Sequence, residues 1–180
     1  MTTANVTTAN VTTTPPSTPT ATTAAGTATS GDRVEEEVLL DAPRARVWRA
    51  LTTPEELGAW FGVDLAGVTL APGAAVAAPF TIPGHEHVVF DVTVEELVPE
   101  ERFAWRWHPH AVEPGVDYAA EPRTRVTFTL EDAPGGRTRL RVVESGFDAL
   151  PAARRAPAFR GVSSGWRAQL HTRLPAYLAA

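Results

Sequence analysis

The chain has 180 residues, of which 43% are hydrophobic, and this suffices for one domain with a substantial core but not for two. All 16 basic residues are Arg, and 21 acidic residues leave a net charge of −5, which argues against a nucleic-acid partner. Without cysteine, neither disulfides nor thiolate metal sites can form. An acidic enzyme, a binding protein and a co-chaperone all remain open.

Residues 1–31 are rich in Thr, carry no charged side chain and open with a tandem Thr-Thr-Ala-Asn-Val repeat. Such a segment has too little apolar surface to offset its ordering entropy, so we expect a disordered tail before a single domain over residues 32–180. It lacks the basic and apolar regions of a secretory signal. No apolar run reaches the roughly 18 residues that a membrane span needs. We therefore expect a cytoplasmic protein without membrane insertion.

Residues 33–40 alternate between apolar and polar side chains, which predicts a strand. Glu36 interrupts its inner face and indicates a position near a sheet edge. Residues 63–70 and 75–82 are predicted as two further short strands, separated by a turn.

Between these strands, the sequence predicts two short helices in succession. The first runs over residues 43–52, because Pro43 suits a first turn and apolar residues recur on one face. Thr53 and Glu56 have the spacing of a capping box, which predicts that a second helix begins immediately. Gly62 ends this second helix.

Alternating residues predict two β-hairpins. The register that joins the apolar sets of the first hairpin pairs Leu97 with Arg102, Val94 with Trp105 and Val92 with Trp107. In the second hairpin, the register with a turn at residues 132–136 pairs Leu130 with Thr138, Phe128 with Leu140 and Val126 with Val142. It also places Glu144 opposite Thr124 on the apolar face.

From about residue 151 the apolar period changes to that of a helix, and this predicts a long amphipathic C-terminal helix. Proline removes a backbone hydrogen bond inside a helix. We therefore expect a late start or a kink at Pro157, and a kink or fraying at Pro175.

This order of elements predicts an α+β helix-grip fold, in which a curved antiparallel sheet wraps the last helix. The chain also carries a series of short motifs in a characteristic order. They are Ala42-Pro43 with Val47-Trp48, Leu51-Thr52-Thr53-Pro54-Glu55, Trp60-Phe61-Gly62, Glu144-Ser145-Gly146-Phe147 and Gly165-Trp166 with Leu170 and Leu174. In these motifs the chain resembles the bacterial heat shock protein 90 ATPase activator-like family of the START-like (SRPBCC) superfamily.

The resemblance implies a cavity between the sheet and the long helix, and strand parity places aromatic side chains on that face. Such a surface can hold an apolar or aromatic ligand, including a lipid. The alternative is that the same rings fill the space as ordinary core. The predicted ligand-binding residues are Trp60, Phe61, Phe90, Phe103, Trp105, Trp107, Phe128, Glu144 and Trp166.

Glu144 is the main polar candidate, because a carboxylate on an apolar face must be paired, protonated or bound to a ligand. The alternative is that Glu144 lies at a strand end, where water reaches it.

Four histidines occur as the pairs His85 and His87, and His108 and His110. With Asp91 nearby, a His/Asp zinc site is one hypothesis. Solvated loop histidines are the favoured alternative, since Pro and Gly flank both pairs, and we expect no metal and no other cofactor.

Five arginines share the outer face of the second hairpin: Arg123, Arg125, Arg137, Arg139 and Arg141. They could bind an acidic partner. Because the resemblance places the first strand beside them, we expect pairing with Glu35 and Glu37 instead.

The sequence contains no phosphate-binding loop and no Gly-x-Ser-x-Gly motif, and we find no catalytic constellation. The leading hypothesis is a non-catalytic domain that binds a small apolar or aromatic ligand. One alternative is a cyclase-like or hydrolase-like enzyme that uses Glu144 as acid or base, and another is a chaperone partner. A protein partner or a homodimer is compatible with each hypothesis.

Overall fold

The computed structural model describes Met1 and residues 32–180, so the tail predicted for residues 1–31 lies outside the described residues apart from Met1. Residues 32–180 form a six-stranded antiparallel sheet with the order β1-β6-β5-β4-β3-β2. The strands are β1 (Arg33–Leu40), β2 (Ala75–Pro79), β3 (Val89–Val98), β4 (Arg102–Trp107), β5 (Thr124–Ala133) and β6 (Arg137–Ser145). The helical elements are α1 (Arg44–Thr52), α2 (Pro54–Phe61), η1 (Phe147–Ala149), α3 (Ala152–Ala168), η2 (Gln169–Arg173) and α4 (Leu174–Ala179).

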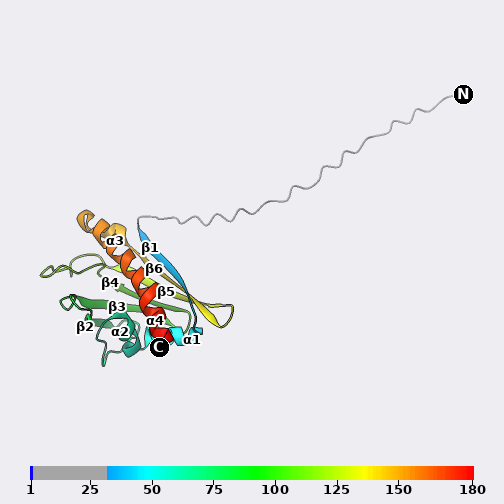
Figure 1. Cartoon of the computed structure of the whole chain (residues 1–180). Helices are drawn as coiled ribbons and strands as arrows, with labels where there is room; N and C mark the ends of the chain where they lie inside the picture. Colours follow the sequence, from blue (N-terminus) through cyan, green and yellow to red (C-terminus); the bar gives the residue numbers. More distant parts are fainter. Residues whose placement is uncertain (2–31) are drawn as a thin grey trace.

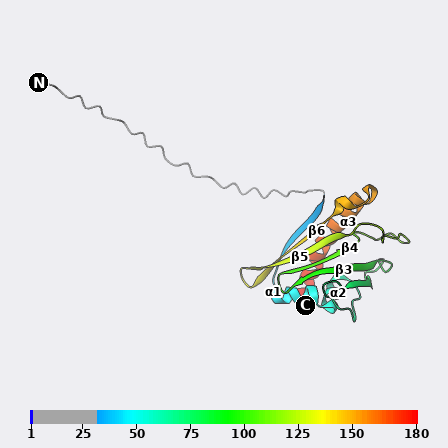
Figure 2. The same cartoon turned by 180° about the vertical axis from the view of Figure 1, so that it is seen from behind.

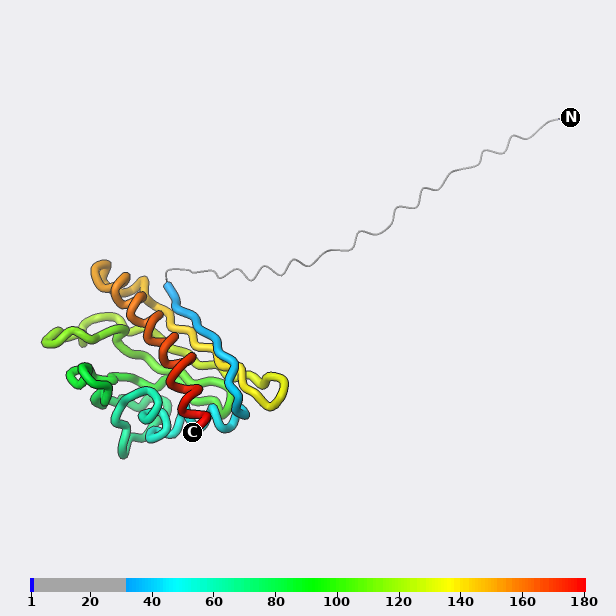
Figure 3. The backbone as a smooth tube through the Cα atoms, in the orientation of Figure 1, coloured from blue at the N-terminus to red at the C-terminus, as the bar shows by residue number. Residues whose placement is uncertain are grey.

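The segment formed by α3, η2 and α4 crosses one face of the sheet, and its C-terminal end lies beside α1 and α2 (Figures 1 and 2). The backbone tube in Figure 3 shows that this segment runs obliquely to the strands. This is the predicted helix-grip fold. Among the described residues, none of the helices has the length and apolar character of a membrane span.

The two short helices form as predicted, but their junction differs. Pro43 is the N-cap of α1, and Gly62, with a φ of 83°, ends α2. The predicted capping box is wrong, because Thr53 makes no side-chain bond to the helix. The carboxylate of Glu56 instead accepts hydrogen bonds from two arginines of α1, at 2.6 Å from Arg46 and 2.7 Å from Arg49.

The region after α2 contains one short strand rather than the two predicted. Residues 63–70 contribute only an isolated bridge from Val63 to Phe80, and β2 ends at Pro79. The side chain of Asp64 accepts the backbone N–H of Ala66 at 3.1 Å. Such a local turn competes with strand pairing and explains why no longer strand forms.

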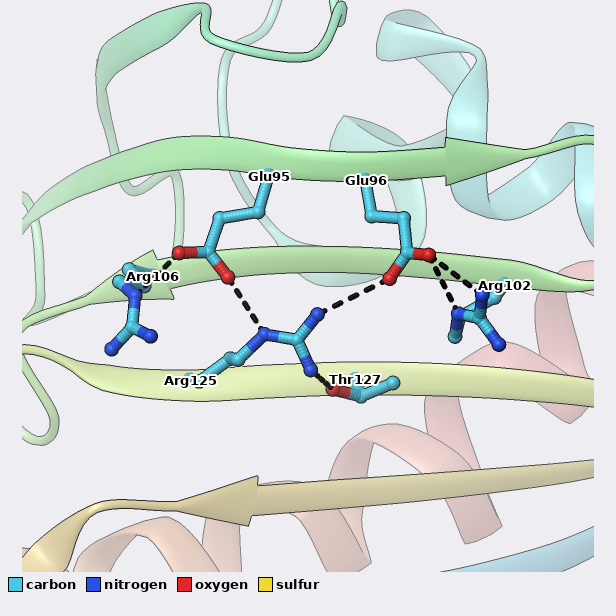
Figure 4. A network of polar contacts seen from close by, with 6 residues as sticks. All are labelled: Glu95, Glu96, Arg102, Arg106, Arg125 and Thr127. Atoms are coloured by element: carbon cyan, nitrogen blue, oxygen red, sulfur yellow. Dashed lines mark hydrogen bonds and ion pairs between the residues drawn. The ribbon is translucent and has the colours of Figure 1, made fainter.

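In the first hairpin, β3 pairs with β4 in the predicted register at Val92 with Trp107 and at Val94 with Trp105. A β-bulge then shifts the ladder by one residue, so Leu97 pairs with Phe103 rather than with Arg102. The bulge brings the side chains of Glu95 and Glu96 to the same face, where Arg125 of β5 binds both (Figure 4).

The second hairpin has the predicted faces but not the predicted register. Its ladder continues to Ala133 and Arg137, which leaves a three-residue turn that includes two glycines with positive φ. The pairs are therefore Leu130 with Leu140, Phe128 with Val142 and Val126 with Glu144. Because the register shifts by two residues, every side chain stays on its predicted face of the sheet. Thr124 is therefore diagonal to Glu144 instead of opposite it.

The C-terminal helix starts at Ala152 and contains Pro157, so of the two alternatives expected at this proline, a late start or a kink, the late start is excluded. Near Pro175 the helix does not fray but changes to a π-helical turn, η2, before it continues as α4. The wider turn removes the need for an α-type hydrogen bond from the proline nitrogen. Val162, Trp166, Leu170 and Leu174 are buried against the sheet, as their spacing predicts.

Ion pairs cover the outer face of the sheet. The edge strand β1 pairs with β6, and Arg141 and Arg139 contact Glu35 and Glu37 at 2.7 Å and 3.3 Å. Arg123 and Arg125 bind acidic residues of β3, whereas Arg137 donates to a turn carbonyl. Cross-strand pairing, rather than an acidic partner, therefore accounts for four of these five arginines.

Candidate functional site

Four of the predicted ligand-binding aromatics form a packed core between the sheet and α3. Phe90, Phe103, Trp105 and Phe128 are at most 1% exposed. Their ring centroids lie close together, at 4.8 Å for Trp105 and Phe128 and 5.6 Å for Phe90 and Trp105. These rings occupy the space that a large cavity would need. Trp60 is also buried, and its indole N–H donates to the carbonyl of Ala50 at 2.8 Å.

Beside this core lies a small cleft of about 170 Å³, which we call the aromatic cleft. Of the predicted site residues, Phe61, Trp107 and Trp166 line it. The remaining lining residues are Phe80, Val88, Val89, His108, His110, Ala111, Val112, Gly161, Val162, Gly165 and Gln169. Gly165 and Val89 are exposed to solvent, so the cleft is open at the protein surface.

Two glycines on α3 make room for this cleft. Gly161 and Gly165 are four residues apart and therefore lie on the same side of the helix. A Cβ atom added at Gly165 would meet no atom within 4 Å. A Cβ atom added at Gly161 would lie only 2.3 Å from the His110 ring, which packs directly on the helix backbone.

Glu144 is fully buried and contacts two residues that line the cleft, Trp107 and Trp166. One carboxylate oxygen accepts the indole N–H of Trp107 at 2.8 Å and the hydroxyl of Thr124 at 2.6 Å. The other oxygen accepts the indole N–H of Trp166 at 2.7 Å. Glu144 thus joins two tryptophans from β4 and α3, and it fixes the direction in which each indole points.

The electrostatic state of Glu144 reflects two opposing effects. Burial raises the pKa of the carboxyl group, because the charged form loses its hydration. The hydrogen bonds from Thr124, Trp166 and Trp107 lower this pKa, but burial has the larger effect. The carboxylate is not among the residues that line the aromatic cleft, which leaves no direct path from Glu144 to a molecule bound there.

The loop between β4 and β5 forms the outer rim of the cleft, and Arg154 of α3 holds it in place. The Arg154 guanidinium donates to the backbone carbonyls of Pro109 and His110 at 2.9 Å and 3.2 Å, and it pairs with Glu121 at 3.2 Å. It also lies over the ring of Tyr118, 4.5 Å from the centroid. One partly buried side chain thereby fixes both ends of the loop to α3.

This loop also borders a second cleft of about 300 Å³, which lies against β3. Trp107 and His108 contribute to both clefts, and Val116 and Tyr118 line only the second. The second cleft has a more polar wall, with Asp91, Glu113 and Asp117 among its residues.

The histidines do not converge on a common point. His87 donates to the carbonyl of Val112 at 2.8 Å, and His108 contacts the carbonyl of Glu121 at 3.2 Å and Asp91 at 3.7 Å. In residues 32–180, no three histidine, aspartate or glutamate side chains are grouped as metal ligands. His110 instead lines the aromatic cleft.

Sequence reasoning missed several residues of the cleft. Gln169, Gly161 and Phe80 were not predicted as site residues, and His110 was considered only for a metal. The spacing of Gly161 and Gly165 on the apolar side of a helix was the available signal, because glycine leaves space where a core helix would carry a larger residue. Nothing in the sequence indicates that the 108–121 loop folds back onto α3.

Taken with the strand order and the oblique closing helix, the cleft between sheet and helix places the protein in the START-like class of helix-grip proteins. Residues 41–179 match the family described as Activator of Hsp90 ATPase homolog 1-like protein. The chain belongs to this family, as its sequence motifs predict.

Solved structures with this fold include DynU16, described as a protein in the dynemicin biosynthetic locus. It is 26% identical with a TM-score of 0.62, over 83% of this chain and 48% of that chain, so this chain spans about half of DynU16. Protein MLL2253 from Mesorhizobium loti is also 26% identical, with a TM-score of 0.61 over 82% of this chain and 96% of the other. CalU16 from Micromonospora echinospora is 20% identical with a TM-score of 0.52, over 82% and 76% of the two chains. Among curated proteins, none matches this chain significantly.

Proposed function

We propose that the protein is a cytoplasmic, non-catalytic binding domain that holds one small apolar or aromatic ring in the aromatic cleft. The observation that carries this proposal is a cleft that has the rings of Phe61, Trp107 and Trp166 in its wall and open space at the Cβ position of Gly165. A protein cavity of about 150 Å³ is sufficient to bind benzene, whereas drug-sized ligands occupy roughly 300 Å³ or more. The cleft of about 170 Å³ therefore fits a single ring.

The geometry favours binding over catalysis. The enzyme hypothesis requires Glu144 to exchange a proton with the bound molecule, and a general acid or base must lie within hydrogen-bonding reach of its substrate. Both carboxylate oxygens of Glu144 already accept hydrogen bonds from protein donors, and the residue does not line the cleft. We assign Glu144 the role of positioning Trp107 and Trp166.

The family description supports a chaperone-associated alternative, because it refers to an activator of the Hsp90 ATPase. No described surface feature favours this alternative over ligand binding, since paired ions cover the outer face of the sheet. The location of DynU16 in a biosynthetic locus is in line with small-molecule binding by proteins of this fold.

Binding can be tested by titrating toluene into the ¹⁵N-labelled full-length protein and following the indole N–H signals of Trp107 and Trp166. The Gly165→Leu variant places a side chain in the open space, and we expect its affinity for toluene to fall at least about tenfold. The Ala168→Leu variant is the matched control, because Ala168 is exposed on the same helix outside the cleft. Unchanged toluene affinity in Gly165→Leu would refute the proposed site.

A further inference from the structure

The second cleft, of about 300 Å³, has solvent-exposed apolar side chains in its wall. Val89 and Val116 line it and are 53% and 46% exposed. In residues 32–180 the only other exposed large hydrophobic side chain is that of Leu39. Trp107 and Tyr118 add aromatic surface to the same wall. A ligand with an apolar part would therefore cover side chains that the protein leaves in water.

The charged side chains that line this cleft are all negative. They are Asp91, Glu113 and Asp117, and none of the described lining residues is an arginine. Arg123 lies outside the lining and pairs with Asp91 at 2.6 Å. Within residues 32–180, Glu113 and Asp117 form no ion pair, and Asp117 accepts only the backbone N–H of Ala119, at 2.9 Å. The wall therefore keeps two uncompensated negative charges, and these favour a cation.

A buried histidine in the same wall has a ring nitrogen without a hydrogen-bond partner. The side chain of His108 is 7% exposed, and its Nε2 atom donates to the carbonyl of Glu121 at 3.2 Å. In the neutral ring the lone pair therefore lies on Nδ1. This Nδ1 atom makes no hydrogen bond within residues 32–180 and lies 3.7 Å from an oxygen of Asp91.

The position of Asp91 shows which cleft the free nitrogen serves. Asp91 lines the second cleft and not the aromatic cleft, so Nδ1 of His108 lies on the side of the second cleft. Two acceptors lie side by side there, and a group with several N–H donors can satisfy both.

We propose that the second cleft binds a small organic ammonium ion. The ammonium group donates to Nδ1 of His108 and is attracted by the acidic side chains, and the apolar part of the ion covers Val89 and Val116. A metal ion fits this wall less well, because no three histidine, aspartate or glutamate side chains of residues 32–180 are grouped as metal ligands. The inference does not depend on ring binding in the aromatic cleft.

The test is a titration of the ¹⁵N-labelled full-length protein with butylammonium chloride, 1-butanol and butyrate, which share a chain length and differ in charge. The amides of Val116 and Asp117 report the second cleft, and those of Gly161 and Gly165 report the aromatic cleft, because each of these residues lines one cleft only. At low salt we expect butylammonium to bind at the second cleft about fivefold more tightly than butanol, with butyrate the weakest. Added salt should reduce this preference, and the ¹⁵N signal of His108 Nδ1 should move as butylammonium binds.

A pair of isosteric substitutions tests the charge of the wall. In the double variant Glu113→Gln with Asp117→Asn, butylammonium and butanol should bind with about equal affinity. Asp41→Asn with Glu55→Gln is the matched control, because it removes the same charge from exposed residues that line neither cleft. The control should keep the preference of the unmodified protein.

Each outcome supports or overturns a stated part of the inference. Equal affinity of the unmodified protein for butylammonium and butanol, or shifts confined to Gly161 and Gly165, would overturn the proposal and leave ring binding in the aromatic cleft intact. A preference that persists in the variant of Glu113 and Asp117 would show that these carboxylates do not select the ligand. A His108 signal that stays fixed at saturation would show that the ammonium group does not contact Nδ1, and the role given to His108 would be wrong.

Discussion

At the scale of single residues, Glu144 makes stability depend on pH in a direction opposite to that of most carboxylates. Burial raises its pKa above the ordinary value of 4.5, so the folded protein binds a proton more readily than the unfolded chain does. The contribution of Glu144 to the free energy of unfolding must therefore fall as the pH rises through 4.5 toward the folded-state pKa.

Glu144→Gln should remove this dependence. Urea unfolding experiments give the free energy of unfolding of the unmodified protein and of the variant at each pH. We expect the difference, unmodified protein minus variant, to decrease as the pH rises from about 4 to about 7. Glu37→Gln on the outer face is the control, because Glu37 is exposed and its partner Arg139 lies on the surface. A difference that stays constant or grows with pH would contradict the role given to burial.

The site shows what residue patterns can and cannot predict. Strand parity indicates that Glu144, Trp107 and Trp166 face the same interior, and this follows from alternation alone. It does not indicate that the carboxylate accepts hydrogen bonds from both indoles, because that depends on side-chain directions from three separate elements. The hydrogen bond from the Gln169 side chain to the carbonyl of Phe61 is equally hidden from sequence, since the two residues are more than one hundred positions apart.

At the scale of elements, α3 uses glycine in two different ways. Gly165 has helical backbone geometry and open space at its Cβ position, so Gly165→Ala should increase the free energy of unfolding by up to about 1 kcal/mol. Gly161→Ala gains the same helix propensity but forces the His110 ring off the helix. We expect the Gly161 variant to be less stable than the Gly165 variant by at least about 1 kcal/mol, as measured by chemical denaturation. Equal stability of the two would show that His110 is not seated on α3.

The attachment of the 108–121 loop to α3 gives a second prediction for elements. Arg154→Ala removes the donors to Pro109 and His110, the Glu121 ion pair and the contact with Tyr118. We expect a loss of about 2 kcal/mol in stability and faster amide hydrogen exchange in the loop, with little change in the strands.

Arg160→Ala is the matched control for the loop, because Arg160 is an exposed arginine on the same helix. Its exchange rates should equal those of the unmodified protein. If Arg154→Ala leaves loop exchange unchanged, the loop is held by other contacts.

Element order and strand faces could be predicted from the sequence, whereas register could not always be. The ladder of β3 and β4 was correct up to Val94, where the bulge begins. The ladder of β5 and β6 was wrong by two residues, because both registers place the same side chains inward and the apolar pattern cannot distinguish them. Only the turn, with glycines at 135 and 136 in positive φ, decides between them.

At the scale of the whole molecule, core packing limits what the fold can hold. The long helix lies over a sheet whose central strands carry Phe90, Phe103, Trp105 and Phe128, and these buried rings fill most of the interior. The aromatic cleft lies beside this core, at the end of the sheet where the 108–121 loop, α2 and the middle of the long helix meet. Its volume of about 170 Å³ suits a small ring rather than an extended ligand.

Ring binding in the aromatic cleft can be observed directly through intermolecular nuclear Overhauser effects between toluene and the labelled full-length protein. We expect contacts from toluene to the side chains of Phe61, Trp107 and Trp166. Contacts to Val116 and Tyr118 in the second cleft, or the absence of any contact at saturating toluene, would contradict it.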